Sequence, residues 1–195
     1  MTTVIAGVAM VAAFVTACRQ IGGGVRSAVM DADSAMATLL GHTVDLPKSM
    51  DYWKVGKRFL WLSDNGADVM RNICIYSYEG MQTDTAAVAM KRDSVMKANL
   101  PGERSNMYMR TVRKAAVTHR TVDTGNRLLL RSEGLWEMEG DAMGGPFVCY
   151  SWADTDCCRI VVAEAFVYAP GHDKQQTMRR LERELLRCAT MNHKE

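Results

Sequence analysis

Glu164 is the carboxylate whose surroundings most suggest chemistry in this chain of 195 residues. It stands in an apolar run, on the same face of a predicted strand as Val162 and Phe166. A carboxylate in such a run either pairs with a cation or has a raised pKa, and a raised pKa suits a general acid or base. We therefore expect either a structural ion pair, with Arg131 as the candidate cation, or a catalytic carboxylate that works together with Asp141.

A second candidate site is the segment of residues 136–147, which mixes apolar and acidic side chains. Gly144 and Gly145 allow close approach of the backbone and movement. Apolar anchors ringed by acidic groups could dock a peptide or a protein partner, but the same aromatic residues could equally belong to the core at the ends of a wide hairpin connection. The candidate binding residues are Trp136, Met138, Asp141, Met143 and Phe147, together with Glu164.

The remaining ligating and nucleophilic side chains form no known motif. The serines lack the Gly-x-Ser-x-Gly and Ser-x-x-Lys contexts of hydrolases, and no His-Glu-x-x-His is present. No pair of cysteine and histidine has the spacing of a zinc site. The sequence therefore predicts no metal, no cofactor and no catalytic set, and it favours a binding or structural protein over an enzyme. The histidines considered are His42, His119, His172 and His193.

Composition excludes some classes of function. The 24 Lys and Arg residues nearly balance the 22 Asp and Glu residues, which gives a net charge of +2. A dedicated nucleic-acid surface carries a dense basic stripe, so no nucleic-acid partner is expected. The basic run of residues 174–187 alternates with acidic residues and is typical of a solvated helix face. Of the six cysteines, Cys157 and Cys158 are adjacent, and neighbours rarely form a disulfide with each other.

The N-terminal residues have two interpretations. Residues 3–17 carry no charge and are followed by Cys18. A run of this length suits the apolar part of a secretory signal, and Val15-Thr16-Ala17-Cys18 is similar to a lipobox, although the basic residues that normally open a signal are missing. Alternatively, the same residues form an internal strand and helix that end at residues 22–24.

Hydrophobic periodicity predicts the elements that would position these residues. Strands are expected at 58–63 and 69–78, around the turn signal Asp64-Asn65-Gly66, and a helix at 84–100. Apolar residues occupy both faces of the expected strand 158–168, which indicates a central, covered strand. Further strands are expected within 107–122 and at 127–138 and 147–152, and the last helix is expected after Pro170-Gly171, with one apolar stripe of Met178, Leu181, Leu185 and Cys188.

These elements predict an α+β fold, in which a two-layer antiparallel sheet carries helices mainly on one face. We divide the chain into residues 1–40, which are either the signal-like segment or a remnant strand-plus-helix region, and a domain of residues 41–195.

Several motifs together are similar to one bacterial family. The motifs are Lys91-Arg92-Asp93-Ser94-Val95-Met96-Lys97, Pro101-Gly102, Met107-Tyr108-Met109, residues 133–148 and residues 161–170. They resemble the carboxy-terminal half of domain-of-unknown-function family DUF4837, whose members resemble lipoproteins of the Gram-negative cell envelope. The resemblance covers roughly residues 41–170. Family members are longer and have their lipobox far upstream, so the resemblance implies an envelope protein that is a truncated relative, and it supplies no activity.

We thus expect an envelope-associated binding or structural domain without chemistry of its own. Its partner would be a protein or a peptide, and its only link to the membrane would be a lipid on Cys18. One alternative is a hydrolase-like enzyme with a carboxylate site around Glu164 and Asp141. A cytoplasmic location is the other alternative, if residues 1–18 are not a signal.

Overall fold

The computed structural model describes residues 30–45 and 47–190. The predictions for Cys18, for the rest of the N-terminal segment and for His193 lie outside these residues. The described part contains three helices and one antiparallel sheet of eight strands. The predicted α+β class is therefore confirmed.

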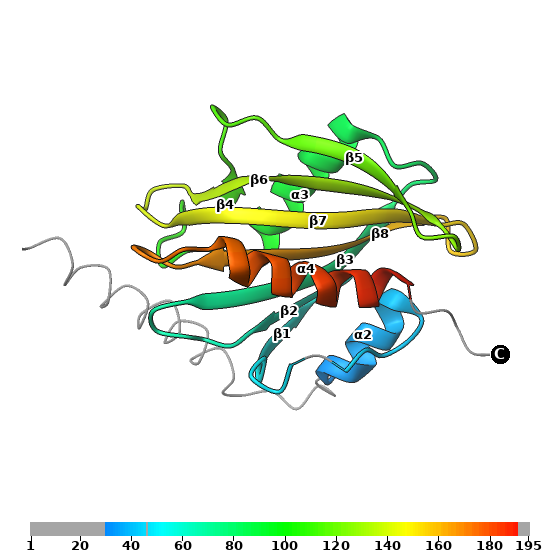
Figure 1. Ribbon diagram of the computed structural model, residues 1–195, viewed down its shortest axis with the longest axis horizontal. Helices are drawn as coiled ribbons and strands as arrows, with labels where there is room; N and C mark the ends of the chain where they lie inside the picture. Colours follow the sequence, from blue (N-terminus) through cyan, green and yellow to red (C-terminus); the bar gives the residue numbers. More distant parts are fainter. Residues whose placement is uncertain (1–29, 46, 191–195) are drawn as a thin grey trace, which may run out of the picture.

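The sheet has the strand order β1-β2-β3-β8-β7-β6-β4, and β5 also pairs with β6 (Figure 1). Every pairing is antiparallel, and strand β8 lies in the middle of the sheet between β3 and β7, as its two apolar faces predicted. The strands are β1 (Tyr52–Gly56), β2 (Phe59–Ser63), β3 (Met70–Glu79), β4 (Met109–Thr111), β5 (Thr118–Asp123), β6 (Leu128–Met138), β7 (Gly144–Asp154) and β8 (Arg159–Tyr168).

The hairpin of β2 and β3 shows how local sequence sets this topology. Asn65 has φ 47°, the left-handed conformation that asparagine tolerates better than most residues. The Asp64 carboxylate accepts a hydrogen bond from the backbone N–H of Arg71 at 2.8 Å and also pairs with its guanidinium. The turn predicted at 64–66 is thus tied directly to the start of β3.

Helices cover both faces of the sheet. Helix α4 (Gln175–Thr190) and helix α2 (Ala32–Leu40) pack on one face, and we call this the α4 face. Helix α3 (Thr85–Asn99) packs on the opposite face, which we call the α3 face. Two of these three helices therefore share a face, and α3 adds a layer on the other side (Figure 1).

The two faces separate the core into two apolar clusters. On β8, Val161, Ala163 and Ala165 face α4, whereas Ile160 and Val162 face α3. The predicted stripe of the last helix is confirmed, because Leu181, Leu185 and Cys188 are buried on the α4 face and Met178 packs at its edge.

The residues that begin the helices fit their positions. The Asp84 carboxylate accepts hydrogen bonds from the backbone N–H groups of Ala86 and Ala87 at 3.4 and 3.0 Å, which caps α3. Asp173 accepts a bond of 3.0 Å from the N–H of Gln175 at the start of α4. These two caps fix where each helix starts above the sheet.

Candidate functional site

Glu164 is fully buried and is paired with a cation. Its side chain has no solvent exposure, and that of Arg92 on α3 is only 2% exposed. The Arg92 guanidinium donates from Nε to both carboxylate oxygens at 3.0 and 3.1 Å, and from Nη2 to Oε1 at 2.7 Å. The Tyr76 hydroxyl donates to Oε2 at 3.3 Å. The expected structural ion pair is therefore present, but the prediction that Arg131 is its cation was wrong, because the cation is Arg92.

Arg131 could not reach Glu164 for two geometric reasons. Strand β7 lies between β6, which carries Arg131, and β8. Arg131 also faces α4, whereas Glu164 faces α3. The actual partner is 72 residues away in the chain, and it is brought in by the packing of α3 on the sheet.

Arg92 makes further contacts that hold α3 in place. Its guanidinium lies 3.9 Å from the centre of the Phe147 ring, and its Nη1 donates to the Thr111 hydroxyl at 2.9 Å. The neighbouring Asp93 carboxylate accepts from the backbone N–H and the hydroxyl of Thr111 at 2.8 and 2.7 Å. This cluster joins α3 to β4, β7 and β8.

Two cysteines flank Glu164 on the neighbouring strands. Cys74 on β3 and Cys149 on β7 are both in register with it and fully buried. Burial, and then the charge of Glu164, raise the pKa of Cys149 to about 12 and that of Cys74 well above its usual value. Burial also raises the pKa of Glu164, against the opposing effect of Arg92. Thiols that stay protonated are poor nucleophiles, so this row of side chains is suited to holding the core together.

A serine–histidine pair continues this row toward the sheet edge. The Nδ1 atom of His119 on β5 lies 2.8 Å from the hydroxyl of Ser132 on β6. Such a pair can activate a serine, and the sequence spacing gave no sign of it. However, Ser132 is only 2% exposed, so a substrate carbonyl could not reach its oxygen in this conformation.

The four apolar residues of the predicted binding segment are core residues. Trp136, Met138, Met143 and Phe147 are between 2% and 6% exposed and pack in the α3-face cluster. The indole N–H of Trp136 donates to the carbonyl of Val167 at 3.3 Å. This agrees with the alternative in which these side chains belong to the core at the ends of a hairpin connection. They are therefore not available as surface anchors.

The two carboxylates of the hydrolase alternative lie in different environments. Asp141 is in the connection between β6 and β7 and is partly exposed. Glu164 is in the middle of β8 and points into the core beneath α3. No described hydrogen bond or ion pair joins the two residues. The described residues also contain no group of three or more His, Cys, Asp or Glu side chains that could hold a metal ion.

The surface next to the predicted segment is hollowed on the α4 face. One hollow of about 620 Å³ lies between the first turns of α4 and strands β6 and β7, and a second of about 540 Å³ lies over the β6–β7 connection. Both are lined by Leu135, Pro146 and Lys174, so they form one continuous surface, which we call the sheet groove. In Figure 1, α4 runs along the sheet over β8 and beside β7, and it leaves β5 and β6 uncovered on this face.

The sheet groove has an apolar floor and a charged rim. Leu135 is 46% exposed although Trp136, the next residue of the strand, is buried, and Met178 of α4 also lines the hollow. Lys174 and Arg179 line one side, and Glu133 lines the other. Asp141, from the predicted segment, lies at the far end.

A polar network fixes the wall of the sheet groove. Arg131 donates to Glu182 of α4 at 2.5 Å and to Glu133 at 2.6 Å. The Tyr150 hydroxyl donates to the same Glu182 at 2.8 Å. Hydrogen bonds and charge from Arg131 lower the pKa of Glu133, so its carboxylate remains ionised at neutral pH. The network therefore ties α4 to β6 and β7 through their side chains.

The candidate residues taken from the sequence did not include Leu135 of the groove floor. They included Trp136, whose side chain points to the core, whereas the side chain of Leu135 points outward. The signal that was available is the strict alternation of a strand, because Leu135 must face opposite to Trp136. The residues contributed by α4 could not be found in this way, since only packing brings the helix beside β6.

Comparison with known proteins supports the resemblance. The model of a family described as a domain of unknown function, DUF4837, matches residues 29–186, which is a longer stretch than the motifs had suggested. No match was found among curated proteins. Among the described residues, no helix is long and apolar enough to cross a bilayer.

Proposed function

The chain belongs to the DUF4837 family, and on this premise we propose that it is a non-catalytic binding domain of the cell envelope that holds an extended peptide segment in the sheet groove. The observation that carries the proposal is the exposed apolar floor at Leu135, at the junction of two hollows. Each hollow has a volume in the range that ligand sites occupy. Two hollows that join end to end suit an extended chain better than a compact molecule.

The charges around the sheet groove favour a polypeptide. Cationic Lys174 and Arg179 on the α4 side face anionic Glu133 on the strand side, and Glu182 adds a second carboxylate on α4. A rim of both signs around an apolar centre is typical of protein–protein interfaces. A peptide with one apolar side chain over Leu135 and polar side chains on either side would match this pattern.

The buried polar groups argue for binding over catalysis. A general acid must reach the substrate within hydrogen-bond distance, and Glu164 has no exposed surface and is occupied by Arg92. The Ser132 hydroxyl is equally inaccessible. We therefore assign the cluster around Glu164 a structural role beneath α3.

The envelope location is supported by the uncharged residues 3–17 and by Cys18. If Cys18 carries a lipid, cells fed labelled palmitate will label the chain, and Cys18→Ala will abolish the label. Labelling of the chain in both forms, or in neither, would contradict lipid attachment at this residue.

A peptide library displayed on phage tests the sheet groove. We expect the protein to select peptides with an apolar residue between polar ones, and we expect Leu135→Asp to reduce their binding at least about tenfold, since it places a charge on the apolar floor. The matched control is Leu128→Asp, on the same strand at a residue that is 63% exposed and lines neither hollow.

Two results would contradict the peptide proposal. One is the absence of any selected sequence pattern in repeated selections. The other is an equal loss of binding in both leucine variants, because that would show a general effect of the added charge on the protein.

A further inference from the structure

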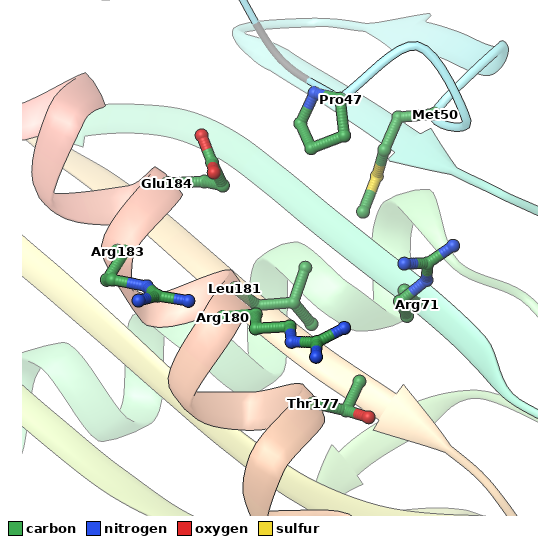
Figure 2. Close-up of a pocket in the computed structure, with 8 residues that line it drawn as sticks. All are labelled: Pro47, Met50, Arg71, Thr177, Arg180, Leu181, Arg183 and Glu184. Atoms are coloured by element: carbon green, nitrogen blue, oxygen red, sulfur yellow. The ribbon is translucent and has the colours of Figure 1, made fainter.

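A third hollow, of about 220 Å³, is separate from the two that form the sheet groove and lies on the other side of α4. Thr177, Arg180, Leu181 and Glu184 line it from α4, at the spacing that places residues on one side of a helix. Arg71 lines it from β3, and Pro47 and Met50 line it from the loop between α2 and β1. We call this hollow the arginine pocket (Figure 2).

Two of its three arginines have no hydrogen-bond or ion-pair partner among the described residues. Arg71 is held by the Asp64 carboxylate and reaches the Ser49 hydroxyl at 3.4 Å. Glu184 is paired with Arg187 at 2.8 Å. In the part of the chain that the structure describes, no hydrogen bond or ion pair is formed by Arg180 or Arg183, the other two arginines of the lining.

The local charge of the arginine pocket is therefore positive. Arg71 is neutralised by Asp64, and Glu184 is neutralised by Arg187. The guanidinium groups of Arg180 and Arg183 are then the remaining charges in the lining of this small hollow. Like charges held close together repel each other and destabilise the folded protein. Figure 2 shows the Arg180 side chain extending from α4 toward the strand that carries Arg71.

We propose that the arginine pocket binds a phosphate monoester group. Two free guanidiniums match the charge of a phosphate dianion, and the planar fork of arginine donates two parallel hydrogen bonds to phosphate oxygens. Thr177 adds a hydroxyl donor at the edge, and the floor of Leu181, Met50 and Pro47 keeps the pocket apolar beneath the charges. The phosphate could belong to a soluble metabolite or to a lipid headgroup such as that of phosphatidic acid.

The arginine pocket is independent of the peptide site. Residues 174, 175, 178, 179 and 182 of α4 line the sheet groove, whereas residues 177, 180, 181, 183 and 184 line the pocket. A failure of one proposal therefore leaves the other unaffected.

Calorimetric titration of the full chain with inorganic phosphate tests the proposal, with sodium chloride at matched ionic strength as the reference. We expect specific binding by the wild type and at least about a tenfold loss of affinity in the double variant Arg180→Gln/Arg183→Gln. The control is Arg179→Gln, which removes one positive charge from the same helix outside the pocket. The thermal midpoint without phosphate should stay equal or rise in the double variant, because the repulsion is removed.

Vesicles identify the source of the phosphate. Co-sedimentation with phosphatidylcholine vesicles that contain phosphatidic acid, and loss of it in the double variant, would assign a lipid headgroup. Binding of inorganic phosphate without such co-sedimentation would assign a soluble phosphate monoester. The proposal is overturned if neither probe binds better than its reference, or if Arg179→Gln weakens binding as much as the double variant does.

Discussion

At the scale of single residues, the pair of Arg92 and Glu164 decides how the α3 face is held. Both side chains are removed from water, which costs several kcal/mol per ion, and the cost is offset only by good geometry and additional hydrogen bonds. The pair has both, because the guanidinium donates to each carboxylate oxygen and Tyr76 donates as well. Loss of either partner would leave an uncompensated charge in the core.

A double-mutant cycle tests this role. We expect Arg92→Met and Glu164→Met each to lower the free energy of unfolding by about 3–5 kcal/mol. The double variant should lose much less than the sum, since no buried charge remains without a partner. Urea unfolding of the four proteins measures the coupling, and strictly additive losses would refute it.

The surroundings of Glu164 were only partly predictable from the sequence. Burial of Glu164 followed from its apolar neighbours, because alternation along a strand is a local property. Its partner did not follow, because Arg92 lies on another element, 72 residues away. The contact of Ser132 with His119 was not predicted for the same reason, because it depends on the register between β5 and β6.

At the scale of elements, α4 is tied to the sheet by a polar network as well as by its apolar stripe. Glu182 accepts hydrogen bonds from Arg131 of β6 and from Tyr150 of β7. Burial alone would raise the pKa of Glu182, but these two hydrogen bonds and the charge of Arg131 outweigh it and lower the pKa below the usual 4.5. The ionised form is therefore favoured in the folded protein.

The lowered pKa gives a prediction about pH. A carboxyl group whose pKa is lowered on folding stabilises the protein above its unfolded pKa and loses that contribution as the pH falls through the folded value. We expect Glu182→Gln to be less stable than the wild type at pH 7, and the difference to shrink as the pH falls below about 4.5. Urea unfolding at several pH values measures it.

A neighbouring residue provides the control for this experiment. Glu184 pairs with Arg187 within the same helix, so Glu184→Gln keeps the contact between α4 and the sheet. Because an exposed pair of this kind contributes little, this variant should unfold close to the wild type at pH 7. A constant difference between Glu182→Gln and the wild type at all pH values would contradict the proposed linkage.

Elements with regular patterns were predictable, and irregular ones were not. The hairpin of β2 and β3, helix α3 and strand β8 all combine a clear period with turn or cap residues at their ends. By contrast, the stretch of residues 107–122 holds two short strands, β4 and β5, which pair with different halves of β6. Short strands carry too few alternations to set their own boundaries.

At the scale of the whole molecule, α2 belongs to the same core as the rest of the fold. Its buried residues Ala35, Met36 and Leu39 are 2–3% exposed and join the α4-face cluster. The helix packs against β1, β2 and β3, which lie in the half of the sheet away from the sheet groove. This helix is also within the range matched by the family model.

This packing predicts the effect of a truncation. A chain that begins at residue 41 should be less stable than one that begins at residue 30, by about 3–6 kcal/mol for the burial of Met36 and Leu39. Urea unfolding of the two proteins measures the difference. Equal midpoints would mean that α2 does not contribute to the core in solution.

What the sequence alone determined was most of the elements from residue 58 onward, the antiparallel class and the family. Periodicity, turn residues and caps act between near neighbours in the chain, so a single sequence contains them in full. The tertiary structure decided which side chains meet. Three examples bring distant segments together. They are the contact of Arg92 with Glu164, the position of Met178 and Leu135 around one hollow, and the position of Arg180 and Arg183 beside Arg71. Such contacts depend on how helices dock on the sheet, and local patterns carry no information about that docking.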